Sequence, residues 1–193
     1  MQKHKDDKRQ MTGVDLGLSA EEKEELRKIA FQAIRCRCLG EVMPVIAVDS
    51  ARLKEPGAAF VCIHKGKDLR GCIGMIEARM PLWETISTMA VQAAFEDPRF
   101  CALANDEIDS IDIEISVLTP IRRIAGPSEI EIGKHGLLVR KGCHSGLLLP
   151  QVAIEHGLDR DRFLDLTCRK AGLHEKAWTD KEVETYIFSA DVF

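Results

Sequence analysis

One nine-residue stretch constrains the fold of this chain more than any other. Residues 110–118 read Ser-Ile-Asp-Ile-Glu-Ile-Ser-Val-Leu, so apolar and polar side chains alternate strictly. Side chains two apart in a β-strand point to the same face of a sheet, so the pattern predicts a strand with one apolar and one polar face. Glu114 lies on the polar face. This is the clearest strand signal in the chain.

The segments around this strand predict an α+β fold. A hairpin is expected from two strands at 60–64 and 69–76, joined by a turn at 65–68. Because most strands meet through hairpins and few strand–helix–strand units alternate, an antiparallel sheet with helices is favoured over a doubly wound parallel sheet. The other predicted elements are a helix from a capping box at Ser19 to a stop at Gly40, a helix from Pro81 to Glu96, hairpin turns at 133–136 and 141–146, helices at 151–156 and 159–171, and a strand at 183–188.

Length and charge limit the classes of function. The 193 residues suit one domain, or one large and one small lobe. A formal net charge of −4 gives no general attraction to nucleic-acid phosphates or anionic membranes, so nucleic acid is disfavoured as a partner. No apolar run approaches the roughly 18 residues of a membrane helix. No membrane association is therefore expected.

The start of the chain and the cysteines indicate the compartment. Residues 1–17 are polar and charged, which predicts a disordered tail and no secretory signal. The chain has seven cysteines and no export signal, which favours a reducing compartment, the cytoplasm, with free thiols.

The segment Leu-Arg-Gly-Cys-Ile-Gly at 69–74 is the strongest candidate for a functional motif. In a regular strand Arg70 and Cys72 share a face, and a guanidinium beside a thiol lowers the pKa of that thiol. Gly71 and Gly74 indicate a bulge, or a place where a ligand or backbone comes close. The segment therefore predicts either a reactive, ligand-binding thiol or a cysteine that is simply packed in the core.

Three other residues are candidates for moving a proton. His135 lies between two glycines in a turn, where it either accepts a proton from Cys72 or only fits an unusual backbone angle. Glu114 is either a base, a partner of Arg70, or part of a solvated strand face. His64 ends the strand that pairs with the Cys72 strand and is a weaker alternative.

Known cofactor and metal motifs are not found. The cysteine and histidine spacings match no zinc pattern, so no metal is predicted. The sequence contains no Walker loop, dinucleotide fingerprint or G-x-S-x-G elbow, and no radical SAM cluster of closely spaced cysteines. The cofactor is therefore left unknown.

The hexapeptide at 69–74 resembles the signature of the AMMECR domain family. Further segments resemble family segments in the same order, and the match covers roughly residues 20–193. They lie at 94–100, 113–118, 133–137, 145–151 and 167–172.

This resemblance implies an α+β fold over residues 18–193 with two unequal lobes that enclose a cleft. The larger lobe is expected to hold both chain ends. The family also implies a genomic setting, because prokaryotic members resemble protein A of the AmmeMemoRadiSam system. Memo-type and radical SAM proteins are therefore expected as partners, and the resemblance implies no particular reaction.

Three functional hypotheses follow. The first is a thiol-dependent enzyme or enzyme subunit, with Cys72 as nucleophile, Arg70 as thiolate or anion partner and His135 or Glu114 handling the proton. Its substrate would be a small molecule or a modified macromolecule. The second is a non-catalytic module that binds an anionic ligand or partner through Arg70. The third is a nucleic-acid-associated regulatory factor that uses the basic residues Arg122, Arg123, Lys134, Arg140 and Lys141.

Overall fold

A computed structural model describes residues 13–193 of the chain. They form two compact units: a first unit of residues 17–118 and 192–193, and a second unit of residues 13–16 and 119–191. Most of the predicted tail lies outside the described residues. The end of that segment is hydrogen bonded, because Gly13 N donates to Gly133 O at 2.9 Å. The predicted cleft, and the predicted lobe that holds both chain ends, stay predictions.

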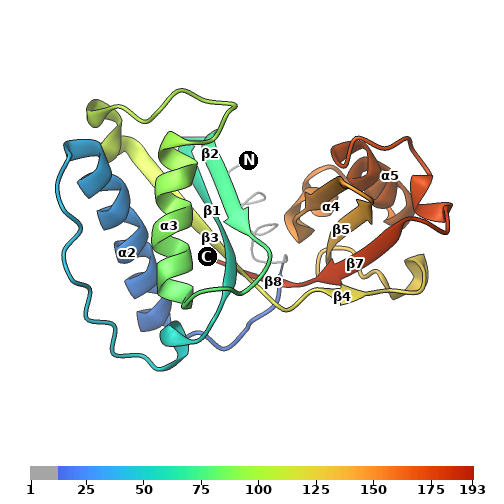
Figure 1. The fold of residues 1–193 in the computed structure, drawn as a ribbon, viewed down its shortest axis with the longest axis horizontal. Helices are drawn as coiled ribbons and strands as arrows, with labels where there is room; N and C mark the ends of the chain where they lie inside the picture. Colours follow the sequence, from blue (N-terminus) through green and yellow to red (C-terminus); the bar gives the residue numbers. More distant parts are fainter. Residues whose placement is uncertain (1–12) are drawn as a thin grey trace. The chain divides into compact units, whose positions relative to one another are not determined.

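The first unit is built on a four-stranded sheet with the order β2-β1-β3-β8 (Figure 1). Strand β1 (Ala58–Lys65) pairs antiparallel with both β2 (Asp68–Met75) and β3 (Ile111–Leu118). Strand β8 (Ala190–Val192) comes from the end of the chain, and the boundary between the two units falls within it. The predicted hairpin and the predicted strand at 110–118 are both confirmed.

Two helices pack together with this sheet, α2 (Ala20–Leu39) and α3 (Leu82–Phe95) (Figure 1). The capping box at Ser19 is confirmed, because its Oγ accepts the Glu22 N–H at 3.2 Å and Glu22 Oε2 accepts the Ser19 N–H at 2.9 Å. Gly40 ends α2 in the left-handed conformation, with φ 69°, as its position predicts.

The second unit has its own four-stranded sheet, with the order β4-β7-β5-β6. Its strands are β4 (Arg122–Arg123), β5 (Gly136–Lys141), β6 (His144–Leu148) and β7 (Glu184–Phe188). Helices α4 (Pro150–Glu155) and α5 (Arg160–Lys170) complete it.

The hairpin predicted at 141–146 is confirmed as the β5–β6 turn, but the one predicted at 133–136 is wrong. The segment before it forms a 3₁₀ helix, η3 (Pro127–Glu129), and then an irregular turn. Ile130 is fully buried there, and its carbonyl accepts the Arg160 Nε–H at 2.7 Å in place of a strand partner. The α+β class with antiparallel pairing is nevertheless confirmed in both units.

Within residues 13–193, no helix combines the length and the apolar character needed to cross a bilayer.

Candidate functional site

The motif cysteine lies on the face of the first sheet that points away from α3. A Cβ added to Gly71 would collide with the Ala93 carbonyl of α3, so Gly71 faces that helix. Cys72 follows directly in β2 and therefore faces the other way. Its cross-strand partner is Cys62 of β1. On the neighbouring strand β3, the cross-strand partner of Cys62 is Glu114.

These three side chains consequently form a row across β2, β1 and β3. His64 lies two residues after Cys62 in β1 and belongs to the same side of the sheet. We call the four residues Cys62, His64, Cys72 and Glu114 the cysteine face.

Cys62 and Cys72 are joined by a disulfide. The expectation of free thiols is therefore wrong for this pair, while the other five cysteines are free: Cys36, Cys38, Cys101, Cys143 and Cys168. The Cα atoms of Cys62 and Cys72 are 4.1 Å apart. This is close to the short spacing of a residue pair in an antiparallel ladder whose members do not hydrogen bond to each other. Cys62 is 7% exposed and Cys72 is half-buried.

Arg70 does not lie in a regular stretch of β2. Ile63 pairs with Gly71 and His64 pairs with Leu69, so Arg70 is the extra residue of a β-bulge. The rule that residues two apart share a face applies to a regular strand, so it does not by itself place Arg70 relative to Cys72. The predicted pairing of the Arg70 guanidinium with the thiolate of reduced Cys72 therefore stays a prediction.

The partner of Arg70 is Glu107, not Glu114. The two side chains make a forked ion pair, with Nη2–Oε2 at 2.8 Å and Nε–Oε1 at 3.1 Å. Arg70 also donates to the carbonyls of Cys101 at 2.8 Å and Ala102 at 3.3 Å. These four bonds use most of the five N–H donors of a guanidinium, so Arg70 has little capacity left for an external anion.

Glu107 is the common acceptor of this network, and no local sequence pattern marks it as a functional residue. It lies in the 3₁₀ helix η2 (Asn105–Ser110) and also accepts bonds from Lys65 Nζ at 3.2 Å and Ala104 N at 3.1 Å. The hydrogen bonds from Arg70, followed by the one from Ala104, lower the pKa of Glu107 to about 2. Arg70 therefore fixes the bulge of β2 to the segment 101–107.

A second ion pair holds Cys72 by its backbone. Asp97 Oδ2 accepts the Cys72 N–H at 2.9 Å, and Arg99 Nη2 donates to the Cys72 carbonyl at 3.3 Å. Arg99 in turn binds Asp97 through Nε at 2.9 Å and Nη2 at 2.7 Å. Both backbone groups of Cys72 thus point out of the β1–β2 pair, and a carboxylate and a guanidinium satisfy them on the edge of the sheet.

We call Asp97 and Arg99 the edge clamp. The Asp97 side chain is only 2% exposed. The hydrogen bond from Arg99 holds the pKa of this carboxyl well below its usual range, and the Cys72 N–H lowers that pKa further. In the sequence the segment Asp97-Pro98-Arg99 has the pattern of a helix terminator, and only the fold brings it to β2.

The two glycines of the motif are explained by contacts within the chain. Gly71 is packed under the α3 backbone, and a Cβ on Gly74 would meet the ring of Phe60 on the neighbouring strand. The close approach that the sequence predicted is therefore made by the protein itself. The predicted role of Gly71, Gly74 and His64 in ligand binding stays a prediction.

His64 and Glu114 are the titratable groups of the cysteine face, and Asp112 of β3, the cross-strand partner of His64, lies on the same side of the sheet. His64 Nε2 is buried and has no hydrogen-bond partner among the described residues. Glu114 is half-buried beside Cys62. No group of three or more His, Cys, Asp or Glu residues in the described part of the chain is arranged to hold a metal ion.

His135 belongs to the second unit, whereas Cys72 belongs to the first. Its Nδ1 accepts the Glu131 N–H at 3.1 Å, and burial lowers its pKa. A neutral ring whose Nδ1 accepts carries its proton on Nε2. The predicted approach of His135 to Cys72 stays a prediction.

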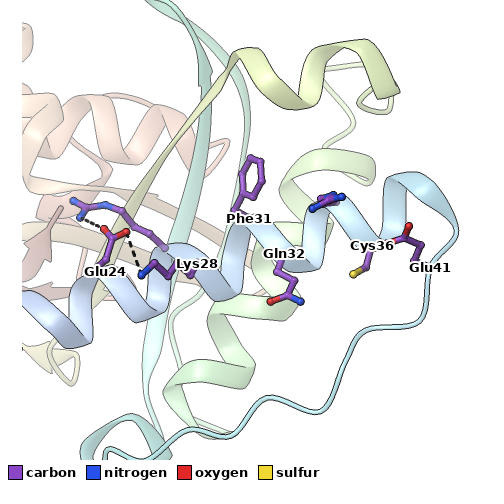
Figure 2. Close-up of a pocket in the computed structure, with 8 residues that line it drawn as sticks. Glu24, Lys28, Phe31, Gln32, Cys36 and Glu41 are labelled. Carbon is purple, nitrogen blue, oxygen red and sulfur yellow. Dashed lines mark ion pairs between the residues drawn. The ribbon is translucent and has the colours of Figure 1, made fainter.

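A pocket of about 600 Å³ lies on the outer side of α2 (Figure 2). Glu24 lines it and forms ion pairs with Arg27 and Lys28, which line it too. Phe31 and Cys36 line it as well, but no residue of the cysteine face does. The pocket and the motif are separate features of the first unit.

The basic residues proposed to bind nucleic acid have acidic or aromatic neighbours. Arg140 stacks over the Tyr186 ring at 5.6 Å. The other four form the ion pairs Arg122–Glu129, Arg123–Glu184, Lys134–Glu131 and Lys141–Asp180. Their charges are therefore largely balanced within the second unit.

Comparison with known proteins agrees with the fold and the motif. A family model described as AMMECR1 matches residues 27–193. Protein NEQ441 of Nanoarchaeum equitans is 39% identical over 175 residues, which cover 87% of this chain and 97% of that protein. A protein of Aquifex aeolicus is 47% identical over 131 residues, which cover 65% of this chain and 67% of that protein.

A solved structure gives the same result. The crystal structure of the uncharacterized protein PH0010 from Pyrococcus horikoshii superposes with a TM-score of 0.83 at 37% identity, covering 88% of this chain and 89% of that one. The ordered motifs, the family match and the shared fold lead to one conclusion: the chain belongs to the AMMECR1 family.

Proposed function

We propose that this AMMECR1-family protein is a thiol-dependent enzyme or enzyme subunit in which Cys72, in its reduced form, is the nucleophile. The observation that carries the proposal is the edge clamp. A buried aspartate and its arginine are both committed to the backbone of this one residue. Fixing a side chain through its backbone in this way is typical of a preorganised reactive group.

The surroundings of Cys72 support a chemical role. Neighbouring strands place Glu114 and His64 on the same face as Cys72, so a base is available on the sheet itself. In the reduced form, the buried and unpartnered Nε2 of His64 is the better candidate to take the thiol proton, because a carboxylate would disfavour a nearby thiolate. Acyl or alkyl transfer suits a thiolate nucleophile, and His135 stays a candidate from the second unit.

The same geometry weakens the alternative in which Arg70 anchors an anion. Arg70 already binds Glu107 and two carbonyls, and its side chain is only 16% exposed. We therefore propose that Arg70 is a positioning residue, which holds the bulge next to Cys72. The nucleic-acid alternative is weakened in turn by the ion pairs of the basic residues in the second unit.

Partners and compartment are part of the proposal. Membership of the AMMECR1 family supports Memo-type and radical SAM proteins as partners, because this chain carries no cluster motif of its own. Five free cysteines, with Cys101 and Cys143 exposed, support a reducing compartment such as the cytoplasm.

Complementation of a strain that lacks the gene tests the proposal. Cys72→Ser should abolish complementation while the protein stays folded, since a serine hydroxyl is hardly ionised at neutral pH. Cys143→Ser changes an exposed, unbonded cysteine and is the matched control, which should complement fully. A folded Cys72→Ser protein that complements as well as the control would end the nucleophile proposal.

A further inference from the structure

We propose that Cys62 and Cys72 form a reversible disulfide that a protein dithiol of the thioredoxin class reduces, and that reduction releases Cys72 as a reactive thiol. This inference rests on the proposed function, because it describes how the proposed nucleophile is stored and released. Nothing in the family match or the related structures assigns such a role to the pair.

The register of the sheet brings the two sulfurs together. Cys62 and Cys72 are direct cross-strand partners, and β1 is held from both sides by its pairing with β2 and β3. The edge clamp fixes Cys72 independently of the sulfur–sulfur bond. We therefore expect the two thiols to stay adjacent after reduction, so that the bond can form again.

The other cysteines indicate that this bond is not one of a set of structural disulfides. Cys101 and Cys143 are exposed yet unbonded, and Cys36 and Cys168 are buried as free thiols. In a reducing compartment, an isolated disulfide is usually catalytic or redox-sensing. The bond also spans only 10 residues within one hairpin, so it adds little to the topology that the backbone pairing already defines.

The step is an ordinary thiol–disulfide exchange. A thiolate of the reductant attacks Sγ of Cys72, the less buried of the pair, and the Cys62–Cys72 bond breaks as Cys62 leaves as a thiolate and takes up a proton. The second thiol of the reductant then attacks the mixed disulfide, releases Cys72 and becomes oxidised with its partner. Two electrons pass from the external dithiol to the pair.

Counting thiols in the full-length protein tests the inference without any enzyme assay. Protein treated with diamide and then freed of it is incubated with thioredoxin, thioredoxin reductase and NADPH under native conditions. It is then quenched in acid, denatured and alkylated, and its peptides are mapped without reduction. We expect five alkylated cysteines and a linked Cys62–Cys72 peptide before treatment, and seven alkylated cysteines after it.

The controls separate the possible results. Cys62→Ser should leave Cys72 alkylated in both states, whereas Cys101→Ser should switch as the wild type does. A pair that stays linked until the protein is denatured is a structural disulfide and overturns the inference, as does a pair that diamide never links. If thioredoxin reduces the pair but Cys72→Ser still complements, the proposed function fails and the reversible disulfide stands. If Cys72→Ser fails to complement but the number of alkylated cysteines never changes, the reversible disulfide fails and the proposed function stands.

Discussion

Replacing Glu107 with glutamine should destabilise the protein in a pH-dependent way. Glu107 keeps a pKa of about 2 in the folded protein, against an ordinary value of 4.5. At about 1.36 kcal/mol per pKa unit, this difference corresponds to about 3.4 kcal/mol of stability at neutral pH. The side chain is still 15% exposed, and solvent screening reduces the expected contribution to about 2 kcal/mol.

The sign of the pH dependence follows from the lowered pKa. The contribution of Glu107 is complete above about pH 4.5 and is lost as the pH falls from there towards about 2. Urea unfolding at pH 7, 5, 4 and 3 measures it as the difference between wild type and Glu107→Gln. That difference should be about 2 kcal/mol at pH 7 and about half as large at pH 3.

The matched control is Glu77→Gln, which removes the carboxylate of an exposed ion pair with Arg79. An exposed pair contributes little, so this change should cost less than about 1 kcal/mol. The account of the Arg70–Glu107 pair is refuted if Glu107→Gln costs no more than this control. It is refuted equally if the difference from wild type stays constant between pH 7 and pH 3.

Three further changes have clear expectations. Gly71→Ala should lower stability by about 1–3 kcal/mol or more, because its Cβ would collide with the Ala93 carbonyl; a Tm like that of wild type would contradict this contact. Asp97→Asn should cost about 2 kcal/mol in urea unfolding at pH 7, since the Cys72 N–H loses a charged acceptor, and faster exchange of that amide should accompany the loss. Ser19→Ala should cost about 1 kcal/mol through the lost helix cap, and a change below 0.3 kcal/mol, on the order of measurement error, would contradict the cap.

Local signals were sufficient to predict most of the regular structure. The alternation over 110–118 predicted β3, and the cap at Ser19 with the stop at Gly40 predicted both ends of α2. Each of these depends on residues that are close in sequence. The hairpin predicted at 133–136 required a strand just before Gly133. The chain is irregular there instead, and the Ile130 carbonyl accepts a hydrogen bond from Arg160 and not from a neighbouring strand.

The cysteine face could not be predicted from the sequence because one extra residue decides it. The β1–β2 turn pairs Lys65 with Asp68, and a regular ladder from this turn would place Cys62 opposite Gly71. The bulge at Arg70 moves the register by one and brings Cys62 opposite Cys72 instead. Two glycines in the motif indicated an irregularity, but not its position.

The ion pairs around the motif were missed for a different reason. Asp97 and Glu107 follow Cys72 by 25 and 35 residues, and only the packing of α3 on the sheet brings their segments to β2. No local pattern marks a carboxylate that will be buried at a distant strand edge. Asp97 lies just after a helix and Glu107 lies in a short 3₁₀ helix, so ordinary local roles explain both residues equally well.

The most direct test of the account compares complementation by Cys62→Ser and Cys72→Ser, with folding of each protein checked by thermal unfolding. The two changes remove the same disulfide, so they have the same effect on any purely structural role of the bond. The account predicts that Cys62→Ser complements and Cys72→Ser does not, because only Cys72 is the nucleophile. Equal behaviour of the two folded variants, whether both complement or both fail, would contradict it.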